Sequence, residues 1–333
     1  MTLSIPAPLV FFRVLAERSG KPAALMIDIA GDIGDGDGML ALFDSAPFAA
    51  LSAGFTCLYP APAPAGPALA ASLQAARWQL AAPGAVCRVD ARLDSAALAP
   101  AAQWIDGDWC MASPRSSGAQ AASRGLALQL VQLMAADADT HEIEALLRRD
   151  PTLSYNLLRL VNSPGVGGGR RVTSFSQALL LLGRQQLGRW LNLMLFAAGS
   201  GDVRSAMLLA RVALRARALE LLARARGLDK PTQDQGFMVG MFSLLGALFG
   251  MPLPDVLAPL ALGEAVQGAL LRREGELGAL LRVFETAERG ALDAVAAQLA
   301  TLQIGADAFN LAMVDAASWM QGVMAETAGA PHG

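Results

Sequence analysis

The sequence has few of the residues that most often carry catalysis or bind metals. It contains only two histidines, His141 and His332, so we expect neither a histidine cluster nor a Ser-His-Asp or Cys-His arrangement. Its three cysteines, Cys57, Cys87 and Cys110, are an odd number without paired spacing. This pattern argues against a disulfide framework and against a zinc knuckle.

Charge is scarce as well. Charged residues make up 17% of the chain and hydrophobic residues 54%, with a mean hydropathy of +0.40. This composition excludes a disordered chain. The net charge is −3 and the isoelectric point is about 5.5, whereas nucleic-acid-binding proteins usually carry a basic excess. We therefore do not expect nucleic acid as a partner.

The sequence shows no targeting or membrane signal. Residues 1–8 lack a basic segment followed by an apolar one, so no secretory signal is indicated. The longest uncharged stretch, residues 237–254, is interrupted by glycines and prolines. We interpret it as a buried core segment and expect no membrane span. Together with unpaired cysteines, this predicts a cytoplasmic protein.

Composition changes near residue 118, which predicts two domains, 1–118 and 119–333. The first holds strand-like patches and proline clusters, so we expect a small α/β unit. Residues 112–123 are rich in Ser, Pro and Gly, which indicates a linker. In the first unit the strands are expected at residues 23–29, 85–89 and 104–111, and the helices at residues 39–43, 68–80 and 95–103.

The second domain has helical periodicity almost throughout. Apolar residues recur every three or four positions, with Pro151 at a helix start, Ser174 as an N-cap and Gly183 at a helix end. We predict an all-α bundle. Its later helices are expected at residues 186–196, 205–226, 237–248, 264–272, 277–289 and 309–324.

Two glycine-rich loops resemble ligand-binding motifs. Residues 31–38 alternate Asp and Gly, but Ala46 stands where an EF-hand requires Glu, so a solvated acidic loop is favoured. Residues 165–169 precede Arg170 and Arg171, as in a phosphate-binding loop, but no Lys-Ser/Thr pair follows at the required spacing. We interpret this loop as a helix–helix connection whose two arginines form a candidate interaction surface.

Two further patterns have simple interpretations. Arginines between residues 211 and 226 fall on one predicted helix, where a solvated face is favoured over a nucleic-acid patch because the regional charge is balanced. Residues 144–146 spell Glu-Ala-Leu, the tripeptide of cyclic-di-GMP phosphodiesterases. Here the tripeptide lies on an amphipathic helix, and we interpret it as a coincidence.

Residues 150–163 (DPTLSYNLLRLVNS), 172–178 (VTSFSQA) and 237–245 (FMVGMFSLL) carry a more specific signal. In sequence and spacing they resemble the HDOD domain, the HD-related output domain of bacterial signal transduction. The resemblance extends over nearly all of residues 119–333. We expect structural roles, such as starting, ending or capping helices, for the family-motif positions Asp150, Pro151, Asn162, Ser163, Ser174 and Gly183.

This resemblance implies an all-α fold related to HD phosphohydrolases. In those enzymes the core helix reads roughly Gly-Leu-Leu-His-Asp, and the His and Asp bind metals. Alignment on Gly240 places Ser243 and Leu244 at that pair. Leucine cannot bind a metal, and a neutral hydroxyl is a poor ligand. The resemblance therefore implies no metal ion, no cofactor and no catalytic residue.

Residues 1–118 occupy the place of the EAL-type domain in one subgroup of HDOD proteins. Residues 107–114 (GDWCMASP) are similar to the closing strand of such domains. A full barrel takes about 250 residues, and no Glu-Ala-Leu occurs before the linker. We expect a short, degenerate EAL-like unit without metal ligands.

These observations predict a non-catalytic protein of bacterial signal transduction. Its HDOD domain would act as a protein-interaction scaffold or output module. The expected partners are other signalling proteins, and cyclic-di-GMP is a further candidate ligand. The alternatives are a cyclic-di-GMP receptor and a phosphodiesterase-type enzyme with a site that the motifs do not reveal.

Overall fold

The structure is a computed structural model. Most of residues 8–114 and 202–328 are described, together with scattered positions between them. In full, the described residues are 8–31, 37–61, 67–114, 126, 128–130, 132–133, 136, 138–147, 177, 183, 188–189, 193, 196, 202–260 and 262–328.

The amino-terminal unit is built on a six-stranded sheet with the order β4-β3-β2-β1-β6-β5. β1 runs antiparallel to β2 and β6, whereas the other neighbouring pairs are parallel. The prediction of an α/β unit is confirmed. The strands are β1 (Leu9–Ala16), β2 (Pro22–Ala30), β3 (Thr56–Tyr59), β4 (Gln79–Leu80), β5 (Val86–Arg88) and β6 (Trp104–Asp106).

Short helices connect β2 to β3 and β3 to β4. Phe48 lies at the centre of an aromatic cluster, stacked on Phe43 at 4.7 Å and on Trp78 at 5.0 Å between ring centroids. Such pairs add to the stabilisation that comes from burying their area. The helices and 3-10 turns of this unit are α1 (Asp37–Phe43), α2 (Ala46–Ala50), η1 (Leu51–Ala53), α3 (Pro67–Ala75) and η2 (Trp109–Met111).

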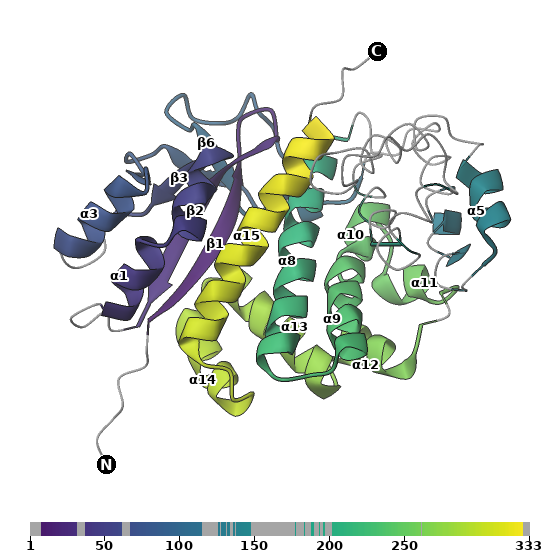
Figure 1. Ribbon diagram of the computed structural model, residues 1–333. Helices are drawn as coiled ribbons and strands as arrows, with labels where there is room; N and C mark the ends of the chain where they lie inside the picture. The colour runs from purple at the N-terminus through teal and green to yellow at the C-terminus, as the bar shows by residue number, and fades with distance from the viewer. Residues whose placement is uncertain are drawn as a thin grey trace.

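The carboxy-terminal part is helical in its described residues, as predicted. α8 lies at the centre of this part, with α9 on one side and α15 on the other (Figure 1). Its elements are α5 (Thr140–Leu147), α8 (Ser205–Ala225), α9 (Lys230–Phe242), α10 (Leu245–Phe249), α11 (Leu253–Leu257), α12 (Glu264–Arg272), α13 (Gly275–Glu288), α14 (Leu292–Thr301) and α15 (Ala306–Ala328).

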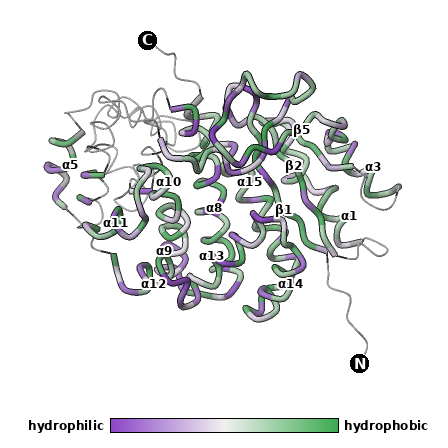
Figure 2. The backbone as a smooth tube through the Cα atoms, turned by 180° about the vertical axis from the view of Figure 1, so that it is seen from behind, coloured by the Kyte–Doolittle hydropathy of each residue, from purple (hydrophilic) through white to green (hydrophobic). Residues whose placement is uncertain are grey.

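The last long helix, α15, packs between the helices and the sheet (Figure 1). The Asn310 side chain accepts a hydrogen bond from the Val10 amide at 2.9 Å and donates one to the Pro8 carbonyl at 3.0 Å. Gln321 donates to the carbonyl of Leu51 at 2.8 Å. Most residues of β1 and α8 are hydrophobic (Figure 2). One core cluster contains residues from both parts of the chain.

The central strand β1 was not among the strands expected from the sequence. Its residues LVFFRVLA are buried on both faces apart from Arg13, which is half-buried. They therefore lack the alternation of apolar and polar residues that marks a strand exposed on one face.

Four predicted elements need correction. The expected helix 68–80 ends at Ala75, and residues 79–80 form the strand β4. Residues 95–103 are turns and not a helix, because Pro100 offers no amide hydrogen and Arg18 binds the carbonyls of this segment, among them Ala99 at 2.9 Å and Ala102 at 3.0 Å. The expected strand 104–111 ends at Asp106, and its last three residues form the 3-10 helix η2. The expected helix 237–248 is divided into α9 and α10 at residues 243–244.

The cysteines and the apolar helices agree with the composition. The three cysteines are free, and Cys57 and Cys110 are buried. Within the described part of the chain, no helix has the length and apolarity needed to cross a membrane.

Candidate functional site

Several positions of the HDOD resemblance fall outside the described residues. These are Asp150, Pro151, Asn162, Ser163, Ser174 and the two arginines, Arg170 and Arg171. Gly183 is described, and it is exposed with a φ of +73°. A left-handed conformation of this kind favours glycine at the end of a helix. Ser243 and Leu244, the positions aligned with the His-Asp pair, both lie in the described part of the chain.

α8 and α9 approach closely just before these two residues. A Cβ atom on Gly240 would lie 2.7 Å from the backbone nitrogen of Ala216, and one on Gly236 would lie 3.2 Å from the carbonyl oxygen of Leu219. Gly236 and Gly240 are one helical turn apart, so together they form a smooth strip against α8. The close approach brings the end of α9 next to Arg215.

Ser243 terminates α9 with its hydroxyl turned inward. Its Oγ donates to the carbonyl oxygen of Gly240 at 2.7 Å and accepts from Nη1 of Arg215 at 2.8 Å. Leu244 follows in a non-helical conformation and is 4% exposed, within the hydrophobic core. At the position that the resemblance aligns with the His-Asp pair, the hydroxyl already has two partners and the next side chain has no ligand atom.

Arg215 is the centre of this arrangement. Its side chain is only 5% exposed, and its Nη2 forms an ion pair with Oε2 of Glu288 at the end of α13. The guanidinium also lies 5.9 Å from the ring centroid of Phe284. A buried cation needs such partners because desolvation of an unpaired charge costs several kcal/mol (order of magnitude). We call Arg215, Ser243 and Glu288 the Arg215 cluster.

The residues of the Arg215 cluster do not fit a divalent metal ion. A metal at this position would require anionic or imidazole ligands, whereas Ser243 supplies a neutral hydroxyl that is bonded to a guanidinium. The positive charge of Arg215 would repel a second cation at this short range. Over the described ranges, no group of three or more His, Cys, Asp or Glu side chains is arranged to hold a metal.

A second charge cluster surrounds Glu220, near the carboxy-terminal end of α8. Its carboxylate accepts from Arg189 at 2.9 Å and from Arg217 and Lys230 at 3.1 Å each. Burial alone would raise the pKa of the Glu220 carboxyl, but hydrogen bonds from Arg189 and Lys230 and the charge of Arg217 hold it below the ordinary value of 4.5. We call these four residues the Glu220 cluster.

The expectation of a solvated arginine face on α8 is wrong for most of its members. Arg215 belongs to the cluster described above, Arg217 also pairs with Asp315 at 3.2 Å, and Arg211 pairs with Asp108 at 2.8 Å. Arg224 is exposed as expected. The sequence offered one signal of this burial. The residues between the arginines of α8 are almost all apolar, which is typical of a helix that is buried on all sides.

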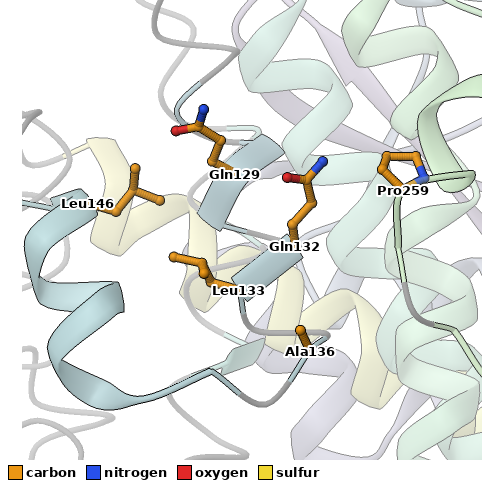
Figure 3. Close-up of a pocket in the computed structure, with 6 residues that line it drawn as sticks. All are labelled: Gln129, Gln132, Leu133, Ala136, Leu146 and Pro259. Atoms are coloured by element: carbon orange, nitrogen blue, oxygen red, sulfur yellow. The ribbon is translucent and has the colours of Figure 1, made fainter.

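A mostly apolar pocket of about 380 Å³ is lined by residues that belong to neither cluster. Pro259 faces it from the segment after α11, opposite side chains from the start of the helical part (Figure 3). Among the described residues that line it, none is charged. They are Gln129, Gln132, Leu133, Ala136, Leu146 and Pro259.

Comparison with known proteins identifies the class of the helical part. Residues 124–279 match the family described as the HDOD domain. The chain thus contains an HDOD domain, and the resemblance stated from the sequence is confirmed for this range. The family match begins at residue 124 and does not include the amino-terminal sheet.

Two curated proteins are similar to this chain. The cyclic di-GMP phosphodiesterase CdgJ of Vibrio cholerae is 30% identical over 199 residues, which are 60% of this chain and 46% of that protein. The uncharacterized protein YuxH of Bacillus subtilis is 28% identical over 144 residues, which are 43% of this chain and 35% of that protein. The chain therefore spans less than half of the length of the relatives it matches.

Among solved structures, a putative phosphohydrolase from Shewanella amazonensis is similar, with a TM-score of 0.42 and 13% identity. The similarity covers 62% of this chain and 98% of that one.

Proposed function

We propose that this chain is a signal-transduction protein whose HDOD domain acts as a protein-interaction scaffold or output module and carries out no metal-dependent hydrolysis at the HD position. The observation that carries the proposal is the Arg215 cluster. A guanidinium bonded to Ser243 and a buried Leu244 replace the ligand pair that such hydrolysis requires.

The test combines metal analysis with a turnover assay. The purified full chain is incubated with Mn²⁺, desalted and analysed for bound metal, and it is then assayed with cyclic-di-GMP for the linear dinucleotide product. We expect less than stoichiometric metal and no turnover above a protein-free control. Stoichiometric metal together with turnover that the Ser243→Ala variant loses would refute the proposal.

A phosphodiesterase is the alternative function, and the name of one relative favours it. The Vibrio cholerae protein carries this activity in its name and is 30% identical over 199 residues. Under this alternative the reaction would use a site outside the Arg215 cluster. Turnover that is unchanged in Ser243→Ala would support this alternative.

We further propose that the amino-terminal sheet derives from an EAL-type domain. Its strands β2, β3 and β4 are parallel, and helices connect them, which is the βαβ arrangement from which such barrels are built. Cyclic-di-GMP is the candidate ligand of this unit. Calorimetry of the full chain with cyclic-di-GMP tests this ligand. Saturable micromolar binding without turnover would make the protein a receptor, and the absence of a binding signal would exclude cyclic-di-GMP as its ligand.

Protein partners are proposed to be other signalling proteins of the cytoplasm. Arg170 and Arg171 form the proposed contact surface. In affinity purification from the native cell, a partner captured by the wild type and lost by the Arg170→Ala/Arg171→Ala variant would support this surface. Equal capture by both proteins would exclude it.

A further inference from the structure

Arginines of α8, together with Arg204 at its N-cap, connect the sheet of the amino-terminal unit to the divided core helix of the HDOD domain. Arg204, Arg211 and Arg215 are spaced seven and four residues apart, so they project from one side of the helix. Arg204 and Arg215 are 5% exposed and Arg211 is 16% exposed in their side chains. We call these three residues the arginine row.

Arg204 binds the two parts of the chain at once. One nitrogen, Nη1, donates to the carbonyl of Cys110 at 3.2 Å, to that of Ala112, and to that of Ala247 in α10 at 3.1 Å. Its remaining nitrogens bond the Asp202 carboxylate, at 2.8 Å from Nη2. A buried guanidinium with this many partners fixes the distance between the segments that it joins.

A second contact joins the same two segments independently. Gly250 ends α10 in a left-handed conformation with a φ of +67°. A Cβ atom placed there would lie 2.8 Å from Cγ of Pro114. Glycine is therefore required by the backbone conformation and by the approach of residue 114. α10 is held against the end of the amino-terminal unit by both contacts.

Arg211 holds the turn that precedes this end. Its Nη1 pairs with Oδ1 of Asp108 at 2.8 Å, and its Nη2 donates to the carbonyl of Gly107 at 2.7 Å. One turn further along α8, Arg215 holds Ser243, which lies just before α10. A cavity of about 40 Å³ between β1 and the helices is lined by Arg211, Asp108 and Glu288 among others.

We propose that residues 107–114 and residues 243–250 move as one unit, coupled by the arginine row, so that a change in the amino-terminal sheet is transmitted to α10 of the HDOD domain. The coupling does not depend on whether the protein has an enzymatic activity. Its physical basis is that a shift of either segment alone breaks hydrogen bonds to a buried guanidinium. Because an unpaired buried charge is costly, the two segments should shift together.

Hydrogen exchange of the full chain, read by mass spectrometry, tests the coupling. Asp108 is 58% exposed in its side chain, so Asp108→Asn removes the charge that Arg211 binds without disturbing the core. We expect exchange to accelerate at least twofold in residues 107–112 and also in α10. Acceleration confined to 107–112, or no acceleration in either segment, would overturn the proposal.

Two further variants sharpen the result. Arg204→Lys keeps the positive charge but replaces the branched guanidinium by one ammonium, and we expect faster exchange in both segments than in Asp108→Asn. Glu264→Gln is the matched control. It also replaces a carboxylate by an amide, but the ion pair that it removes, with Arg272 at 2.8 Å, is exposed and lies within α12. Acceleration of α10 in this control as well would show a general loosening of the bundle and would overturn the proposal.

Discussion

Arg215 and Glu220 lie five residues apart on α8, and their side chains are 5% and 7% exposed. The first is a single cation held by one carboxylate and one hydroxyl. The second is a carboxylate held by three cations, which are themselves shared with Asp234 and Asp315. One of these cations, Lys230, is 63% exposed. The Glu220 cluster thus opens toward water, whereas the Arg215 cluster is closed on itself.

This difference teaches which charges the fold needs most. A buried ion with few partners loses nearly all of its compensation when one is removed, whereas an ion with several partners near solvent loses only a part. The Arg215 cluster should therefore be the more sensitive of the two. Substitutions in and around the two clusters measure this difference.

The largest effect is expected from Arg215→Met. The change leaves the Ser243 hydroxyl and the Glu288 carboxylate without their guanidinium, and we expect a loss of about 3 kcal/mol in the free energy of unfolding. Urea unfolding followed by circular dichroism measures it. Arg224→Met, an exposed arginine of the same helix, is the control. Equal losses in the two variants would show that the Arg215 cluster is not important for stability.

Gly240→Ala should have the next largest effect. Its new Cβ would lie 2.7 Å from the backbone nitrogen of Ala216, so α8 and α9 must separate, at a cost of about 2 kcal/mol in the free energy of unfolding. Gly322 is an exposed glycine of α15, and no atom of the described residues would lie within 4 Å of a Cβ added there. Gly322→Ala should stabilise the protein by about 0.5–1 kcal/mol through helix propensity. Effects of the same sign in urea unfolding would contradict the close approach at Gly240.

Glu220→Gln should cost less, about 1.5 kcal/mol at neutral pH, and the loss should depend on pH. The folded-state pKa of Glu220 is lowered from 4.5, so its contribution is complete above about pH 4.5 and disappears as the pH falls through the lower folded value. Unfolding free energies of wild type and variant should converge in acid. A difference that persists unchanged at low pH would argue that Glu220 acts by packing and not by charge.

Lys230→Ala should have the smallest effect, below about 0.5 kcal/mol, because its ammonium is exposed and screened by salt. The measurement is again urea unfolding, at low and at high ionic strength. A loss comparable to that of Glu220→Gln would mean that Lys230 is an essential member of the Glu220 cluster.

Much of the helical part could be predicted from periodicity and end signals. The expected helix 264–272 has the bounds of α12, and 205–226 differs from α8 by one residue. The break at residues 243–244 could not be predicted, because FMVGMFSLLGAL is apolar on both sides of it. At the break, the Ser243 hydroxyl accepts a hydrogen bond from Arg215, a residue of another helix that periodicity cannot pair with it.

The sequence named Ser243 and Leu244 but not the side chains that surround them. Ser243 and Leu244 were identified by alignment on Gly240, and both lie at the junction of α9 and α10. No pattern indicated that Arg215 would take the hydroxyl or that Glu288 would balance the charge. Arginine patterns indicate a charged helix face, but only the packing of neighbouring helices shows whether that face meets water or carboxylates.

By itself, the amino-acid sequence determined the helical class of the described carboxy-terminal residues and the α/β class of the amino-terminal unit. These depend on local periodicity and on residue type. Only the tertiary structure decided that α15 packs against the sheet, that β1 is central and that the charges of α8 are paired. Those features depend on contacts between distant segments, whose partners are chosen by burial and by the cost of leaving a charge unpaired.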